Sequence, residues 1–301
     1  MLRNSNKDAT LHLSKKGKYF MEENAYSGTY VRDNKNLNLQ ILKENSDYSH
    51  SRKPFPLKTI VDKTRAEEIK AFFATTDIPS EWLDKSKSIW ERSVALAKWI
   101  AKNIKHANPD PWPEHKNCID LYKWNKEHQT GFNCRCHAIM LHELLLTADI
   151  ENRFITCMPK DVNDPDCHVV NLIWLPELNK WAMLDSDETE YAVDADGIPL
   201  SLQEMRSHLV NEKPFFIKPL EGFTINEEYL NAYWCKNLYR FHSHTINTYN
   251  VEDTADGKFL KADKLFHLFP DKVLRAECDS DYFEKECEIF TSSEEEFWGT
   301  N

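Results

Sequence analysis

The chain has 301 residues and a formal net charge of −11, from 38 basic and 49 acidic side chains. This balance argues against nucleic acid as a partner, because binding to a phosphate backbone depends on clustered Lys and Arg. No apolar run approaches the roughly 18 residues that a membrane helix needs, so we expect no membrane insertion. A hydrophobic content of 41% still supports a substantial core.

The chain contains only seven glycines. Phosphate-binding and dinucleotide-binding loops need glycines at fixed spacings, and no such fingerprint occurs here. We therefore predict that the protein uses no cofactor. The first 25 residues are polar and lack the apolar segment of a secretion signal. A cytoplasmic location is thus the default expectation, and an extracytoplasmic one would apply if a leader had been removed.

Eight cysteines are spread through the chain, and none forms a Cys-x-x-Cys pair. A chain of this size does not need disulfides to hold its core. Most of these residues are therefore predicted to be buried, reduced thiols. Cys278 and Cys287, in an acidic stretch near the C-terminus, could pair in an oxidising compartment.

The N-terminal part, residues 1–84, is predicted to be an extension of short strands and one helix. Apolar and polar residues alternate at 11–13 and at 37–42, which is typical of strands. Residues 64–67 (Thr-Arg-Ala-Glu) have the spacing of a capping box, in which Thr and Glu satisfy each other's free backbone donors. This box predicts a helix that ends near Ala74.

The central part, residues 85–215, is predicted to be an α+β domain in which a helix precedes an antiparallel meander. Apolar spacing and turn residues predict helices at 86–104 and 134–147 and strands at 153–157, 169–175, 181–185 and 191–193. Asn133 is the expected cap of the second helix. An Asp-Gly turn at 194–197 predicts a hairpin after the last strand.

The last part, residues 216–301, is predicted to be a helical and irregular extension that packs on the central domain. A capping box at Thr224 predicts a helix here, and a box at Ser201 predicts another near the end of the central part. After His242 the pattern becomes irregular. Acidic side chains crowd residues 277–296, which is typical of a solvated face.

Three reactive side chains stand at the ends of the central elements. Cys134 begins a predicted helix, where free N–H groups and the helix dipole favour a thiolate. His168 comes directly before one strand, and Asp185 ends the next. A thiol, an imidazole and a carboxylate in this order are the parts of a nucleophile with its base and orienting group.

The hairpin itself can join two of these groups. A turn at 176–180 would place residues 174 and 181 opposite each other, and extending that register puts Asp185 within two residues of His168. Cys136 lies about 200° around the helix from Cys134, so only one of the two thiols can face a given cleft. His137 is a rival base, although packing or capping is its simpler role.

Residues 134–138 (Cys-Arg-Cys-His-Ala), His168 at the head of a strand and residues 181–185 (Trp-Ala-Met-Leu-Asp) resemble the transglutaminase-like superfamily. This superfamily lies within the wider papain-like group of cysteine enzymes. The resemblance covers about residues 90–190 and implies a papain-like core, with the nucleophile helix packed on an antiparallel sheet. Three positions depart from the family pattern: Phe132, Val170 and Ser186 replace a glycine, an aromatic residue and a proline.

The resemblance implies that Cys134 attacks an amide carbonyl of a peptide or protein substrate and forms a thioester. His168 would act as base and then acid, and Asp185 would orient it. The backbone N–H of Cys134 would form part of the oxyanion hole. Hydrolysis is preferred to transfer onto an amine, because the sequence contains no visible site for a lysine acceptor.

The second oxyanion donor is not evident from the sequence, and three upstream residues are candidates: Trp124, Gln129 and Asn117. Trp112 lies in a proline-rich loop at 108–113 and could line the cleft.

Two other functions stay open on the sequence. A zinc protein could draw its ligands from five Cys and His residues, although Cys-x-Cys within one helix is poorly spaced for a tetrahedral site. These residues are Cys134, Cys136, His137, Cys167 and His168. A catalytically silent module with the same fold could bind peptide or glycan. The preferred interpretation includes no metal, and the sequence predicts no oligomeric state.

Overall fold

The computed structural model describes residues 30–50, 52–162, 164–252 and 263–299. Its helices are α3 (Lys35–Glu44), α4 (Lys63–Phe73), the 3₁₀ helix η1 (Ser80–Leu83), α5 (Ile89–Asn103), α6 (Cys118–His128), α7 (Cys134–Thr147), α8 (Leu202–Val210), α9 (Glu227–Asn237), α10 (Asp271–Cys278) and α11 (Glu294–Trp298). Its strands are β1 (Lys58–Thr59), β2 (Asn152–Met158), β3 (His168–Leu175), β4 (Lys180–Leu184), β5 (Glu190–Val193), β6 (Phe216–Pro219), β7 (Arg240–His244), β8 (Ile246–Asn247), β9 (Leu265–Leu268), β10 (Tyr282–Lys285) and β11 (Glu288–Thr291). None of these described helices is both long and apolar enough to cross a membrane.

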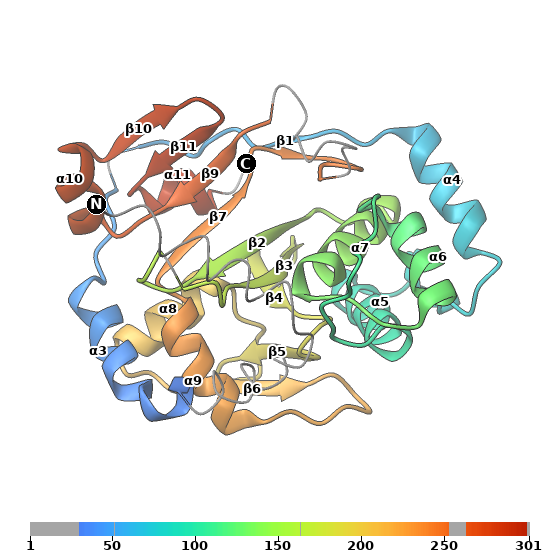
Figure 1. Ribbon diagram of the computed structural model, residues 1–301, viewed down its shortest axis with the longest axis horizontal. Coiled ribbons are helices and arrows are strands. Elements are labelled where there is room, and N and C mark those ends of the chain that lie inside the picture. The colour runs from blue at the N-terminus through green and yellow to red at the C-terminus, as the bar shows by residue number, and fades with distance from the viewer. Residues whose placement is uncertain (1–29, 51, 163, 253–262, 300–301) are drawn as a thin grey trace.

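One seven-stranded sheet organises the molecule (Figure 1). Its order is β10-β11-β9-β7-β2-β3-β4, and every neighbouring pair is antiparallel except β9 and β11. Two smaller pairs, β1 with β8 and β5 with β6, lie outside it. Figure 1 shows α4, α5, α6 and α7 grouped on the right of the view, and α3, α8 and α9 at the lower left. The predicted α+β class, with a helix packed on a mostly antiparallel sheet, is confirmed.

Both faces of the central strands are buried, which explains their nearly continuous apolar sequence. Successive residues of a strand point to opposite faces. In β3, Val169 and Ile173 join the apolar cluster that includes α4, α5, α6 and α7. Val170 and Leu172 join the second cluster, which includes residues of α8, α9 and α11. The sheet therefore lies between two helical layers.

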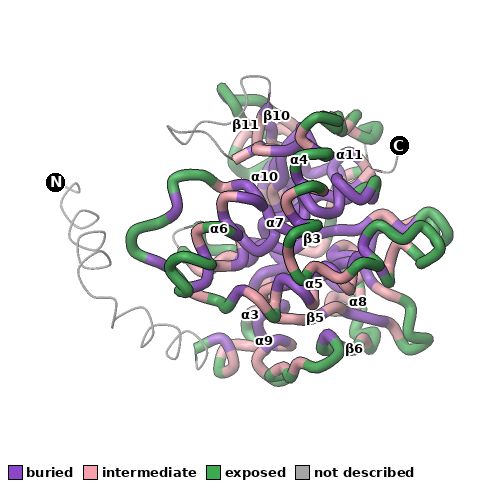
Figure 2. The backbone as a smooth tube through the Cα atoms, turned by 90° about the vertical axis from the view of Figure 1, so that its right-hand side faces the viewer, coloured by how far each residue is buried: buried purple, intermediate pink, exposed green. Residues whose placement is uncertain are grey.

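Helix α7 begins and ends at the residues that the sequence predicted, and the side chain of Asn133 accepts a hydrogen bond from the N–H of Cys136. Every residue of α7 except Arg135 is buried. Figure 2 shows the helix among the buried, purple parts of the chain. Burial on all sides explains why its apolar residues follow no single helical stripe.

The hairpin of β3 and β4 also has the predicted register. Trp174 pairs with Trp181 and Asn171 pairs with Leu184. The chain then turns, and Asp185 forms an isolated bridge with Glu190 at the start of β5. The Asp-Gly turn at 194–197 also forms, since the N–H of Asp194 donates to the carbonyl of Ile198. The chain also doubles back there as predicted, since Val193 and Pro199 form an antiparallel bridge and the N–H of Leu200 donates to the carbonyl of Ala192. The longer pairing of β5 is with β6.

The predicted strand at 37–42 is wrong, since these residues belong to helix α3. Alternating apolar residues over such a short stretch are compatible with a strand or with a helix. The helix is favoured here because α3 packs against α9 and α8. Leu42 is fully buried there. The other expected strand, at residues 11–13, lies outside the described residues.

For two of the three predicted capping boxes, the helix forms but a different residue is its N-cap. The helix near residue 64 is capped by Asp62, whose carboxylate accepts the N–H groups of Thr64 and Arg65. The helix expected from Thr224 is capped by Asn226. Asp and Asn cap as well as Thr does, so the spacing of the box alone could not choose between them. The box at Ser201 and Glu204 is confirmed.

The C-terminal part is more regular than the sequence indicated. It supplies β7, β9, β10 and β11, which are four of the seven strands of the main sheet. Within the acidic stretch, Ile289 and Thr291 of β11 are buried while their neighbours are partly exposed. The prediction of an irregular segment is therefore wrong, because β11 pairs with β10 and β9 and its alternate residues pack inward. The prediction of a solvated acidic face agrees with the structure, since every acidic side chain at 277–296 except that of Glu296 is exposed or partly exposed.

Candidate active site

Cys134 is the first residue of α7 and is 9% exposed. The segment before it is held by a backbone ladder: Phe132 donates to the carbonyl of Lys105, and Ala107 donates to the carbonyl of Phe132. Gly131 has a φ of +83°, and a Cβ at this position would lie 2.1 Å from the Lys105 carbonyl oxygen. Only glycine allows this close approach, which fixes where the helix begins.

His168 and Asp185 are in direct contact. The Nε2 of His168, the first residue of β3, lies 2.5 Å from Oδ2 of Asp185. The other oxygen of Asp185 accepts the backbone N–H groups of Asp187, at 2.8 Å, and Glu188, at 3.2 Å. Both oxygens of this buried carboxylate are therefore engaged, and its position relative to the imidazole is fixed.

Cys134 approaches the other side of the same ring. The sulfur of Cys134 and a ring nitrogen of His168 lie within 4.8 Å of each other. Because Nε2 faces Asp185, Nδ1 is the nitrogen left for the thiol. Burial favours the neutral ring, but the Asp185 carboxylate and, to a smaller extent, the neighbouring Cys134 side chain outweigh it and hold the pKa of His168 well above its usual value. The imidazolium form is thus favoured beside the sulfur.

Helix α9 covers the histidine from the other side. The rings of Tyr233 and Trp234 meet the ring of His168 edge-on, with centroids 5.6 and 5.7 Å away. The hydroxyl of Tyr233 donates to Asp166, and the indole N–H of Trp234 donates to Glu190 at 2.7 Å. These bonds fix both rings, so the C-terminal part of the chain helps to enclose the group formed by Cys134, His168 and Asp185.

A second carboxylate, Asp187, enters the same site. One ligand atom each from Cys134, His168 and Asp187 lies within 4.8 Å of the others. Asp187 is held by His106, whose Nδ1 lies 2.8 Å from it, and by Nε2 of His137 at 3.5 Å. Burial opposes the charge of Asp187, but the two histidines outweigh this effect and lower its pKa.

Two more acids follow Asp185: the partly buried Glu188 in the turn and the buried Glu190, which begins β5. Burial raises the pKa of Glu188 to about 7. Burial and the nearby charge of Asp185 raise the pKa of Glu190 well above its usual value. The neutral form of Glu190 is therefore favoured beneath Trp234, which limits the negative charge packed against Asp185.

The oxyanion and cleft candidates lie in different settings. The side-chain oxygen of Asn117 caps α6 through the N–H of Asp120 and also accepts from Arg65. Its amide group donates to Asp120, so Asn117 serves the fold. Trp124 stacks on His128 with centroids 4.1 Å apart, Gln129 is exposed at the left-handed C-cap of α6, and Trp112 is 42% exposed.

The zinc set expected from sequence does not form among the described residues. Two groups of possible ligands occur among these residues: Cys134, His168 and Asp187, without Cys136, His137 or Cys167, and a separate group of His50, Glu294 and Glu295. Burial raises the pKa of Cys136 to about 12. His137 donates from Nδ1 to the carbonyl of Ser186, which matches the packing role expected for it. All eight cysteines are free thiols here, Cys278 and Cys287 included.

A network of charges lies beside Cys134. Arg135 pairs with Glu252 and donates to Thr156 at 3.2 Å, and its charge acts on Cys134. Glu252 also accepts a hydrogen bond from Nε2 of His244 at 3.0 Å. The other ring nitrogen of His244, Nδ1, lies 2.5 Å from a carboxylate oxygen of Asp263. This network ties the start of α7 to the strand β7.

The network predicts a pH dependence of stability. Burial opposes the His244 charge, but Asp263 and Glu252 outweigh it and raise the pKa of His244. Protonated His244 therefore stabilises the folded protein in full at pH values below about 6.5, the pKa of histidine in the unfolded chain. This stabilisation is lost as the pH rises through the higher pKa that His244 has in the folded protein. Burial raises the pKa of Glu252, but the charges of Arg135 and His244 outweigh it and lower this pKa to about 2. The contribution of ionised Glu252 to the free energy of unfolding is therefore complete above about pH 4.5.

We expect His244→Asn to lower the Tm most between about pH 4.5 and 6.5, and the difference from wild type to shrink by about 2–4 °C at higher pH. Thermal unfolding of both proteins from pH 5 to 9 measures this difference. His208→Asn, at a partly exposed position in the last turn of α8, is the control. A Tm difference for His244→Asn that stays constant or grows toward alkaline pH would contradict the prediction.

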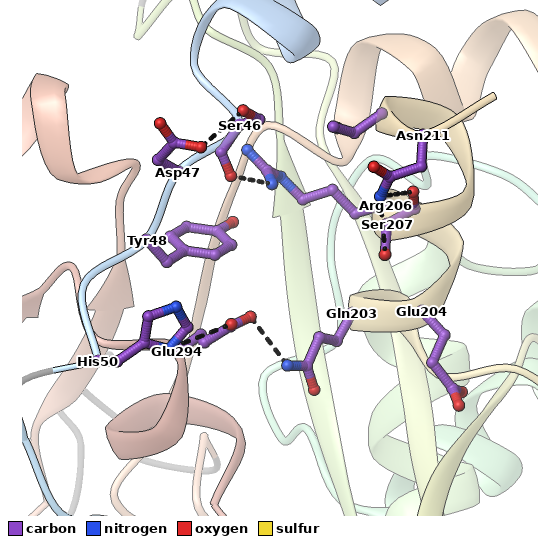
Figure 3. A pocket seen from close by; sticks show the side chains of 11 residues that line it. Ser46, Asp47, Tyr48, His50, Gln203, Glu204, Arg206, Ser207, Asn211 and Glu294 are labelled. Carbon is purple, nitrogen blue, oxygen red and sulfur yellow. Dashed lines mark hydrogen bonds and ion pairs between the residues drawn. The ribbon is translucent and has the colours of Figure 1, made fainter. Parts of the chain in front are cut away.

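Two cavities lie away from these residues. One of about 630 Å³ lies between the segment around Tyr48 and helix α8. Figure 3 shows Gln203 and Arg206 extending from α8 toward this segment, with Glu294 between His50 and Gln203. A second cavity of about 300 Å³ lies beside it and shares Gln203 and Glu294. Cys134, His168 and Asp185 line neither of them.

Sequence reasoning missed several residues of the site. His106 and Asp187 come from a loop and a turn, and only the fold brings them together beside His137, which the sequence analysis had named. Tyr233 and Trp234 come from a helix that the sequence assigned to a peripheral extension. One signal was present, since Asp187 and Glu188 directly follow Asp185 in a turn where carboxylates crowd.

Comparison with known proteins supports the resemblance drawn from the sequence. Residues 79–186 match the family described as the Transglutaminase-like superfamily, and this segment contains Cys134, His168 and Asp185. No curated protein matched the chain.

A solved structure described as "a Putative Cysteine Protease from Cytophaga hutchinsonii" shares 15% sequence identity with the chain. The match covers 53% of this chain and 54% of that one, with a TM-score of 0.29. The chain thus spans about half the length of that structure, and a likeness this distant carries no weight for the activity. Together with the geometry above, the family match identifies residues 79–186 as a transglutaminase-like superfamily domain.

Proposed function

We propose that the protein is a cysteine-nucleophile enzyme that hydrolyses amide bonds of a peptide or protein. The observation that carries this proposal is the chain of contacts from Asp185 through His168 to Cys134 at the start of α7. In this proposal Cys134 is the nucleophile, His168 the acid and base, and Asp185 the orienting carboxylate. The family match supports it, because the matched segment spans all three residues.

The first half of the reaction forms a thioester. The Cys134 thiolate attacks the amide carbonyl carbon, a C–S bond forms, and the carbonyl electron pair moves onto oxygen. The oxyanion lies at the start of α7, where we assign the N–H of Cys134 as one donor. When the electron pair returns, the C–N bond breaks and the imidazolium of His168 gives its proton to the departing nitrogen.

The second half releases the acid. Neutral His168 takes a proton from water, whose oxygen attacks the thioester carbonyl, and the Cys134 sulfur leaves as thiolate. Asp185 keeps the imidazole in the same orientation through both halves, because its second oxygen is held by backbone donors from Asp187 and Glu188. Transfer of the acyl group to an amine differs only in the acceptor.

The nucleophile assignment is tested by alkylation. We expect iodoacetamide near neutral pH to label Cys134 first among the eight cysteines, and His168→Ala to slow this labelling at least tenfold. Labelled peptides are identified by mass spectrometry after digestion. His208→Ala, which removes a partly exposed histidine of α8, is the control. Labelling of Cys134 no faster than that of buried Cys136 would refute the proposal.

The reaction type is tested with substrates. A panel of glutamine-containing peptides is incubated with the enzyme, with and without an added primary amine. Release of ammonia or peptide fragments that does not depend on the amine supports hydrolysis. Incorporation of the amine with little hydrolysis would assign the enzyme to acyl transfer, and no turnover of any substrate by a selectively reactive Cys134 would favour the binding module.

A further inference from the structure

We propose that the group Cys134, His168 and Asp187 is a zinc site, and that zinc bound there blocks the nucleophile. The three residues offer a thiolate sulfur, an imidazole nitrogen and a carboxylate oxygen, and these atoms all lie within 4.8 Å of one another. Ligands of a tetrahedral zinc ion stand roughly 3.5 Å apart. Small side-chain rotations therefore suffice to close the site.

The charges of the ligands suit a divalent ion. A thiolate and a carboxylate supply two negative charges, and neutral imidazole supplies a third donor, so the group neutralises Zn²⁺. Sulfur and nitrogen ligands select zinc over calcium or magnesium, which prefer sites made entirely of oxygen. Three protein ligands leave the fourth position for water or for a substrate carboxylate.

The surroundings of the ligands are those of a built metal site. Zinc-binding histidines commonly donate their second ring N–H to a carboxylate, which fixes the ring and its tautomer. Asp185 accepts the hydrogen bond from Nε2 of His168 in this way. The other ring nitrogen, Nδ1, is therefore the one that would bind the ion. The third ligand, Asp187, is itself held by His106 and His137.

Asp185 and Asp187 would therefore have different roles, Asp185 in orienting His168 and Asp187 in binding the metal. Asp185 contacts only the far side of the imidazole and its own loop, whereas Asp187 reaches the group that contains the sulfur. Hydrolysis as proposed above needs Asp185 and assigns no part to Asp187. A metal ligand explains why a second buried carboxylate lies beside the nucleophile.

The consequence for activity rests on the proposed function, whereas the binding itself does not. Zinc on the sulfur removes the free thiolate and occupies Nδ1 of His168, so attack and proton transfer are both stopped. Releasing the metal with a chelator would restore both groups. Availability of zinc would thus set the fraction of active enzyme.

The test measures binding and protection separately. The full chain carrying Cys287→Ser, which removes the exposed thiol, is reduced and titrated with zinc against a chromophoric chelator. We expect one zinc per chain, protection of Cys134 from iodoacetamide, and recovery of labelling with EDTA. Asp187→Asn is expected to raise the zinc Kd at least tenfold. Asp196→Asn, an exposed carboxylate in the same region, should change it less than threefold.

Each outcome decides the inference. An unchanged Kd in Asp187→Asn, or zinc that binds without protecting Cys134, overturns it. Zinc binding that survives Cys134→Ser also overturns it. If Asp187→Asn does not fold, His106→Asn replaces it, because removing a group that holds a metal ligand also weakens binding about tenfold or more. If Cys134 is unreactive even without zinc, the proposed function fails, while the titration still reports on the metal site.

Discussion

Asp185→Asn is expected to lower kcat for amide hydrolysis by about 10²–10⁴-fold while the protein stays folded. The carboxylate lies 2.5 Å from Nε2 of His168 and raises the pKa of that ring. An amide in its place can present a donor to Nε2, which favours the wrong tautomer and weakens the imidazolium. KM should change much less, because Asp185 is buried behind the imidazole.

The measurement is steady-state hydrolysis of the best peptide from the substrate panel, together with the rate of Cys134 alkylation. Two variants complete the test. Asp196→Asn removes an exposed carboxylate of the same region and should retain full activity. Asp187→Asn removes the other buried carboxylate near the sulfur. If Asp187→Asn lowers kcat more than Asp185→Asn does, Asp187 is the orienting residue and the assignment of Asp185 is wrong.

Gly131→Ala is expected to destabilise the protein by about 3 kcal/mol or more. The added Cβ would lie 2.1 Å from the carbonyl oxygen of Lys105, which is backbone and cannot rotate away. The residue also has a φ of +83°, which side-chain-bearing residues rarely adopt. The backbone must move at the point where the chain enters α7, so we expect slower labelling of Cys134 as well.

Gly197→Ala is the matched control for this prediction. Gly197 has nearly the same dihedral, with a φ of +81°, but no atom lies within 4 Å of the Cβ position. This variant therefore carries the backbone penalty alone, about 1 kcal/mol. Urea unfolding of both variants gives the two free energies at equal m-values. If the two losses are equal, close approach to Lys105 does not constrain the start of α7.

The sequence determined the parts of the site that depend on neighbours along the chain. A cap at Asn133 and the apolar residues after it predicted the limits of α7, and the short turn before Trp181 predicted the register of β3 and β4. Helix caps and hairpin turns act over a few residues, so their signals survive in a single sequence. The contact between His168 and Asp185 follows from that register.

Only the tertiary structure decided which remote residues complete the site. Asp187 meets His106 across 81 positions, and His168 meets Trp234 across 66, from 168 to 234. Four strands of the main sheet come from the C-terminal part. Their apolar and polar residues alternate over only a few positions, so the sequence does not identify them as strands without the neighbouring strands. Pairing between distant segments depends on the side chains that each strand meets. No local pattern along the chain encodes such a pairing. The position of Cys134 at the start of its helix could be predicted, because the cap Asn133, Cys134 and the helix are consecutive in the sequence.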